Sequence, residues 1–183
     1  MTLAPGHFHA ALIQKKMVPG VTSRNYVYAP LDADTVSYIE HIAAFNNRAE
    51  HPTTWELDVR VGSSWLERFQ REQPGNVVVL SGRNRSKIDL MRLAVSDNLH
   101  VLADKPWVIE FSDFPKVEEL YREMDARDVF VWDIMTGRHE ITNQLMREFI
   151  RDPSIFGKWQ VGSAAQPALV MESKHFLMKS VDG

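Results

Sequence analysis

The chain has 183 residues, a formal net charge of −3 and no cysteine, and 44% of its residues are hydrophobic. This length suits one globular domain, or one domain and the start of another. The slight negative charge argues against nucleic acid and anionic membranes as partners, and no apolar run approaches the roughly 20 residues that span a bilayer. The lack of cysteine excludes disulfides, thiolate zinc sites and cysteine nucleophiles.

The first residues, Met1 to Ala4, have the pattern of the end of a buried strand. A usual strand has about 5–6 residues, so this one is short. We therefore expect Met1 to be an internal methionine of a longer protein. No basic-then-apolar signal segment opens the chain, which favours a cytoplasmic location, although an export signal ahead of Met1 would not be visible.

Strand-like and helix-like segments alternate along the chain. Short apolar runs predict strands over residues 1–4, 27–29, 55–61, 76–80, 100–103 and 129–132. Apolar residues at helical spacing predict helices over residues 35–45, 63–71, 86–97, about 115–124 and 140–150. The inward faces of the last three helices are expected to carry Ile88, Met91, Ala94 and Val95, then Val117, Leu120, Tyr121 and Met124, then Ile141, Leu145 and Phe149.

This alternation predicts an α/β fold with a doubly wound parallel sheet covered by helices on both faces. A (β/α)8 barrel has the same alternation, but it needs eight repeats and about 250 residues. We expect residues 1–135 to form a Rossmann-like dinucleotide-binding domain. Residues 136–183, with apolar runs at 158–161 and 168–170, would begin an incomplete, β-rich α+β substrate domain.

The turn after the first strand resembles a glycine-rich phosphate loop in one position only. In Gly-x-Gly-x-x-Gly, the glycines let the backbone approach the pyrophosphate at a helix N-terminus. Here Gly6 holds the middle position, while Ala4 and His9 hold the first and third. A plain strand-to-helix turn is an equally good interpretation of this segment alone.

His7 and His9 suggest a second interpretation, since a His-x-His pair at a strand end begins the metal site of many barrel hydrolases. We expect the pair to lie at the start of a helix, where positions i and i+2 do not share a face. His139-Glu140 resembles the start of a zinc-protease motif, but Asn143 stands where its second histidine belongs. We therefore expect no bound metal and rank a metal-dependent hydrolase last.

The end of the second strand leaves the choice of cofactor open. An acidic residue about 20 positions after the glycines usually binds the ribose hydroxyls of NAD. Pro30 occupies the expected position, and Asp32 follows two residues later. Asp32 either serves this role or caps the next helix, so NAD and NADP remain alternatives.

The turn Asp104-Lys105-Pro106 follows the strand at residues 100–103. Ligands of open α/β sheets bind at the carboxyl ends of strands, and proline stiffens a turn and can adopt a cis bond. A lysine there can bind and polarise a substrate hydroxyl, or act as an acid or base if burial lowers its pKa. The plain alternative is a surface turn with an Asp–Lys pair.

Together, the run Val77 to Asn84, the following helix and the run His100 to Pro106 resemble the glucose–fructose oxidoreductase/inositol dehydrogenase/MocA family. The resemblance covers residues 1 to about 170, and Gly6 begins what is similar to the family's glycine loop. It implies a Rossmann domain, NAD or NADP as the cofactor, and a carbohydrate-like small molecule as the substrate.

The resemblance also implies roles for particular residues. Lys105 corresponds to the family's catalytic lysine, which contacts nicotinamide ribose and substrate, and Asp104 replaces the usual glutamate. Arg138 stands at the entry to the substrate domain. The cofactor-binding residues implied by the resemblance and by the loops above are Gly6, His7, Phe8, Asp32, Ser81, Gly82, Asn84, Asp104 and Lys105.

Family members are much longer than this chain. Their second domain contains a large open sheet that walls the substrate pocket, pairs subunits into oligomers and carries the aspartate and histidine that transfer protons. We therefore expect an enzyme in the longer protein, a homo-oligomer through the missing sheet, and no turnover by this fragment alone. A non-catalytic dinucleotide-binding or regulatory protein is the alternative.

Overall fold

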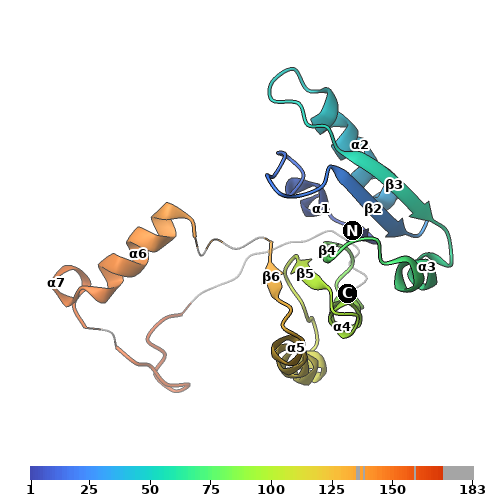
Figure 1. Ribbon diagram of the computed structural model, residues 1–183. Coiled ribbons are helices and arrows are strands. Elements are labelled where there is room, and N and C mark those ends of the chain that lie inside the picture. The colour runs from blue at the N-terminus through green and yellow to red at the C-terminus, as the bar shows by residue number, and fades with distance from the viewer. Residues whose placement is uncertain (135–136, 138, 159, 171–183) are drawn as a thin grey trace. The chain divides into compact units, whose positions relative to one another are not determined.

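The computed structural model describes residues 1–134, 137, 139–158 and 160–170 (Figure 1). The chain divides into two compact units, one built on residues 1–135 and the other on residues 136–180. None of the helices within the described ranges has the length and apolar character needed to cross a membrane.

Six parallel strands of the first unit form one open sheet in the order β3-β2-β1-β4-β5-β6. The strands are β1 (Thr2–Leu3), β2 (Arg24–Ala29), β3 (Glu56–Val61), β4 (Val77–Leu80), β5 (His100–Ala103) and β6 (Val131–Asp133). The strand order reverses between β1 and β4, as in dinucleotide-binding folds. The predicted doubly wound sheet is confirmed, and the barrel alternative is wrong because β3 and β6 form two open edges.

Helices cover both faces of this sheet. They are α1 (His9–Leu12), α2 (Ala33–Asn47), α3 (Trp65–Glu72), α4 (Lys87–Ser96) and α5 (Phe114–Arg127), with a short 3-10 helix, η1 (Phe111–Asp113), before α5. Adjacent residues of β2 point to opposite faces, so Val27 joins the core formed with α1 and α2, while Tyr28 joins the core formed with α3, α4 and α5.

The predicted elements of the first unit agree with the structure to within a few residues. All four expected inward residues of α4 are fully buried, because this helix packs against the central strands. In α5, Leu120 is buried but Tyr121 is 47% exposed, so the expected stripe is one residue too wide. β3 is only partly buried, since this strand lies at an edge of the sheet.

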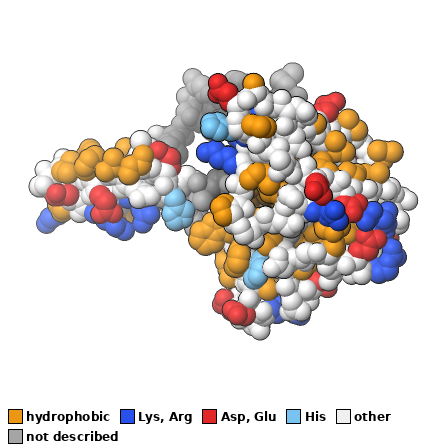
Figure 2. Space-filling view, turned by 45° about the horizontal axis from the view of Figure 1, so that its top comes forward, with side chains coloured by type: hydrophobic (Ala, Val, Ile, Leu, Met, Phe, Trp, Pro, Cys, Tyr) orange, Lys and Arg blue, Asp and Glu red, His pale blue; other side chains and the backbone are white. Residues whose placement is uncertain are grey.

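The second unit contains α6 (Ile141–Arg151) and α7 (Pro153–Phe156). The expected inward face of α6 is wrong, because Ile141, Leu145 and Phe149 are 62%, 46% and 47% exposed. Figure 2 shows hydrophobic side chains gathered along one side of this helix and charged ones along the other. Residues 160–170 form no strand, since none of them pairs with another described segment. Arg138 lies outside the described residues.

Candidate functional site

The loops that follow β1 and β4 lie directly against each other at the carboxyl edge of the sheet. The backbone N–H groups of Gly6 and His7 both donate to the carbonyl oxygen of Ser81, at 3.1 and 2.9 Å. A Cβ atom added to Gly82 would lie 2.2 Å from the carbonyl oxygen of Ala4. Glycine is therefore required at position 82 by the close approach of two backbones.

Ala4 adopts a left-handed backbone conformation, with φ at 39°. This is the position of the first glycine in a glycine-rich loop, and glycine adopts such a conformation without steric cost. The backbone at position 4 thus has the conformation that favours glycine, although the residue is alanine. The sequence keeps only the middle glycine of the pattern, whereas the structure also keeps this left-handed conformation at the first glycine position.

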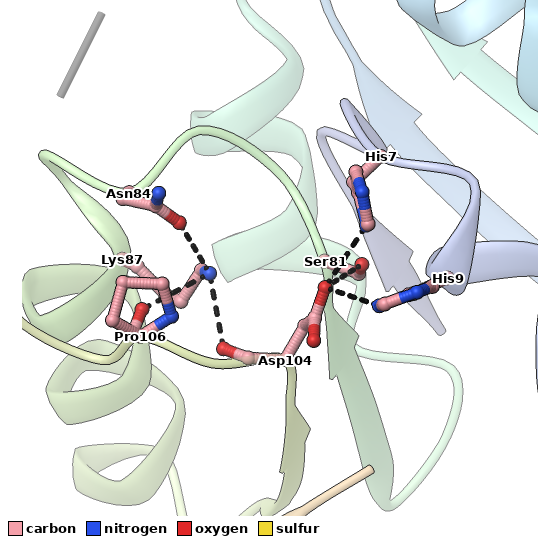
Figure 3. Close-up of polar contacts among 7 residues, drawn as sticks. All are labelled: His7, His9, Ser81, Asn84, Lys87, Asp104 and Pro106. Carbon is pink, nitrogen blue, oxygen red and sulfur yellow. Dashed lines mark hydrogen bonds and ion pairs between the residues drawn. The ribbon is translucent and has the colours of Figure 1, made fainter. Parts of the chain in front are cut away.

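A cluster of polar side chains forms around Asp104, which follows β5 and is only 3% exposed (Figure 3). Its Oδ2 atom accepts hydrogen bonds from His7 Nδ1 at 3.1 Å, His9 Nδ1 at 3.0 Å and Ser81 Oγ at 3.1 Å. Burial alone would raise the pKa of Asp104. The hydrogen bonds from His9 and Ser81, with the charges of His9 and Lys87, lower it instead, so the carboxylate is ionised at neutral pH.

The two histidines meet although they are two residues apart, because α1 begins only at His9 and His7 lies in the loop before it. The helical spacing expected for this pair therefore does not apply. Their rings lie 4.1 Å apart in an edge-to-face arrangement. Phe8 lies between them in sequence, contacts both rings and is 53% exposed.

Lys87 is a buried charged residue that the sequence prediction missed. It begins α4, is 2% exposed, and its Nζ donates to Asn84 Oδ1 at 2.7 Å and to the carbonyl oxygens of Asp104 and Pro106 at 3.0 and 3.2 Å. Burial lowers the pKa of its ammonium to about 8, and the Asp104 carboxylate partly offsets this effect. The signal was its spacing, four residues before the buried Met91.

Three acceptors thus surround the three N–H bonds of one ammonium group, and two of them belong to the Asp104-Lys105-Pro106 turn. Lys87 therefore fixes this turn to the first turn of α4. The Lys105–Pro106 peptide bond is cis, the form that the sequence allowed. Lys105 itself is exposed, and the side chain of Asp104 bonds to the cluster above, so the plain interpretation of a surface Asp–Lys turn is wrong.

A solvent-open cavity of about 130 Å3 lies at the point where the strand order reverses. Its lining includes Gly6, Asp32, Gly82, Arg83 and Lys87. Asp32 also caps α2, since its Oδ1 accepts a hydrogen bond from the Thr35 N–H at 2.9 Å. The ribose and capping interpretations of Asp32 are therefore compatible in position.

The predicted residues fall into three groups. Gly6, Asp32 and Gly82 line the cavity, and His7, Ser81 and Asp104 form the cluster. Phe8 and Lys105 are exposed, and Asn84 contacts Lys87. Arg83 and Lys87 were not expected at the cavity.

Three solved structures share the fold of this chain. A presumed oxidoreductase from Parabacteroides merdae is 40% identical with a TM-score of 0.86, and the match covers 91% of this chain and 38% of that protein. A presumed oxidoreductase from Thermotoga maritima is 16% identical with a TM-score of 0.59, covering 83% and 42% of the two chains. One from Klebsiella pneumoniae is 20% identical with a TM-score of 0.52, covering 82% and 39%.

This chain therefore spans less than half the length of the solved proteins that it matches. No protein-family model matches it, and no curated protein does. The two more distant matches show the fold alone. The Parabacteroides protein is close enough in sequence for its description to bear on function.

Proposed function

We propose that this chain is the dinucleotide-binding part of a longer NAD(P)-dependent oxidoreductase of the glucose–fructose oxidoreductase/inositol dehydrogenase/MocA family. The observation that carries the proposal is the cavity between the β1 and β4 loops, because ligands of doubly wound sheets bind at this switch point. The 40% identity with a presumed oxidoreductase supports the enzyme class. The longer protein would act on a hydroxyl carbon of a sugar, polyol or related small molecule.

The residues around the cavity fit a dinucleotide. Gly6 and Gly82 both line the cavity, and their missing side chains let the two loops lie close together beside it. The N–H groups of Phe8 and His9, at the start of α1, donate no hydrogen bond within the described residues, and a phosphate would accept from such groups. Asp32 lines the same cavity beyond β2, on the side where this fold binds the adenosine ribose.

Bound there, nicotinamide would donate or accept the hydride. Lys105 would bind the substrate hydroxyl, and Lys87 would hold the turn that carries it. Asp104 and Asn84 would border this end of the site. The family resemblance assigns proton transfer to residues of the second domain, so we expect this chain to bind cofactor without turnover.

Cofactor binding is tested by titrating NADH and NADPH into the chain and into the Gly6→Asp variant while the fluorescence of the reduced cofactor is recorded. A carboxylate at position 6 would repel the pyrophosphate and weaken binding at least about 10-fold. Gly75→Asp is the matched control, because Gly75 precedes β4 at the opposite edge of the sheet. If neither reduced cofactor binds the folded chain, the proposal fails.

Catalysis is tested in the longer protein with Lys105→Met. We expect turnover to fall about 100-fold or more while the variant still binds the cofactor, because the lysine would act on the substrate hydroxyl. Unchanged turnover would contradict the assigned role.

A non-catalytic dinucleotide-binding protein is the second candidate. The observation in its favour is that the N–H groups of Gly6 and His7 are already bonded to Ser81, which leaves fewer amides for a phosphate. This candidate predicts cofactor binding by the longer protein with no hydride transfer to any hydroxyl substrate.

A further inference from the structure

We propose that His7, His9 and Asp104 bind one divalent transition-metal ion, a function beyond the dinucleotide site. One nitrogen of each ring and one carboxylate oxygen all lie within 4.8 Å of one another. Two of the residues come from the β1–α1 segment and the third from the end of β5, so the parallel sheet brings them together.

The spacing of these atoms suits ligands that share one ion. Both Nδ1 atoms lie 3.0–3.1 Å from Oδ2 of Asp104. Imidazole nitrogens and carboxylate oxygens bind Zn2+ at about 2.0–2.2 Å, so neighbouring ligands of one ion are about 3.0–3.6 Å apart in octahedral or tetrahedral geometry. Each Nδ1 atom is therefore close to the separation from Oδ2 that coordination requires.

The carboxylate of Asp104 provides a second, independent observation. Its Oδ1 atom is buried and has no hydrogen-bond partner, whereas three donors converge on Oδ2. A buried carboxylate oxygen without a partner is costly, because it has lost water and gained nothing in return. A cation bound through both carboxylate oxygens would give Oδ1 a partner and compensate the charge of Asp104.

The donor set determines the class of ion. Two imidazoles with one carboxylate suit Zn2+, Fe2+ or Mn2+, whereas Mg2+ and Ca2+ prefer sets made of oxygen alone. With both rings neutral and Asp104 ionised, the three side chains carry one negative charge.

The competing interpretation is a cluster held by hydrogen bonds alone. In that case each histidine keeps a proton on Nδ1 and donates it to Asp104. A bound metal needs the Nδ1 lone pair, so the ring proton moves to Nε2. The two interpretations therefore predict opposite tautomers for His7 and His9 in the presence of metal.

The first experiment treats the chain with a chelator, removes the chelator by dialysis, and titrates Co2+ while its visible absorption is recorded. Calorimetry with Zn2+ gives the stoichiometry and affinity. We expect saturation at one ion per chain. His9→Gln and Asp104→Asn should each weaken binding at least about 10-fold, since loss of a residue that only hydrogen-bonds to a metal ligand already costs that much.

His100→Gln is the matched control, because His100 begins the strand that ends before Asp104 and lies at the opposite edge of the sheet. It should bind metal like the unmodified chain. Thermal unfolding checks that each variant is folded. If Asp104→Asn does not fold, His9→Gln and the tautomer measurement below decide the result.

The second experiment measures the imidazole 15N chemical shifts of His7 and His9 with and without Zn2+. Movement of the proton from Nδ1 to Nε2 in both rings supports the site. Rings that keep their Nδ1 protons at saturating Zn2+, binding unaffected by His9→Gln, or no binding at one ion per chain would overturn it. NADH titration in chelator is a separate measurement, so failure of the metal site and failure of the cofactor site are distinguishable.

Discussion

Two helices of similar length, α4 in the first unit and α6 in the second, show how differently the two units use the same sequence pattern. Both carry apolar residues at helical spacing. In α4 this face is buried against the sheet, whereas in α6 it is 46–62% exposed at Ile141, Leu145 and Phe149. The spacing of apolar residues predicts which side chains share a face, but a partner element decides whether that face is buried.

The same difference separates the units in function. Every candidate site residue that the structure describes belongs to the first unit, at the carboxyl edge of a complete sheet. The burial of α4 fixes Lys87, and Lys87 fixes the turn after β5. The rigidity of the site thus depends on the packing of the first unit.

The sharpest test of this comparison is a matched pair of truncations. Met91→Ala in α4 removes a fully buried side chain and should lower the free energy of unfolding by about 2–5 kcal/mol, through lost burial and a cavity. Leu145→Ala in α6 removes a side chain that is 46% exposed and should cost about 1 kcal/mol or less. Urea unfolding followed by circular dichroism measures both.

Equal losses at the two positions would break the comparison, because they would mean that the face of α6 is covered in solution. Neither substitution changes Ala94 or Val95, so α4 keeps these two buried residues in both variants.

The next largest effect is expected for Lys87→Met, which keeps an apolar stem but removes the ammonium group. Three oxygen atoms, two of them from the turn after β5, would lose their donor. A buried acceptor left without a partner costs about 1–3 kcal/mol. Lys116→Met is the control, since Lys116 makes partly exposed ion pairs with Asp89 and Asp113 and should cost about 1 kcal/mol or less. A smaller loss for Lys87→Met than for Lys116→Met would contradict this role.

Lys87 should also leave a signature in the pH dependence of stability. Its pKa is about 8 in the folded chain and near the ordinary lysine value of 10.5 in the unfolded chain. Between these values the unfolded state binds more protons, so stability rises with pH by up to about 1.4 kcal/mol per pH unit. Relative to Lys87→Met, the unmodified chain should therefore gain stability from pH 8 to pH 9.5 in urea titrations. A flat difference between the two would contradict the lowered pKa.

The sequence predicted the first unit well because local patterns and tertiary packing agree there. The β-branched run at 77–80 and the apolar face of α4 both match buried elements. The sequence shows a glycine at position 82, but it does not predict why glycine is required there, because the carbonyl of Ala4 approaches from a distant segment. Contacts between segments about 95–97 residues apart, such as those of His7 and His9 with Asp104, have no local signal.

The site was predicted in part for the same reason. The turn after β5 could be recognised from the residues that compose it, and its lysine was taken as the important charge. The buried lysine is Lys87, which reads as a polar residue at the start of a helix unless its spacing to Met91 is considered. The second unit was predicted worst, because the apolar face of α6 is not buried by any of the described residues.

The smallest predicted effect concerns the loop after β1, where the first unit carries a residue poorly suited to its backbone. Ala4→Gly should stabilise the chain by about 0.5 kcal/mol, because glycine removes the left-handed strain but adds freedom to the unfolded chain. Ala94→Gly, the same substitution inside α4, should instead destabilise by about 1 kcal/mol or more. Changes of opposite sign in the free energy of unfolding, measured with urea, would show that the loop keeps the backbone of a glycine-rich turn without its glycines. A loss at position 4 as large as that at position 94 would mean that the Ala4 methyl group contributes packing that outweighs its strain.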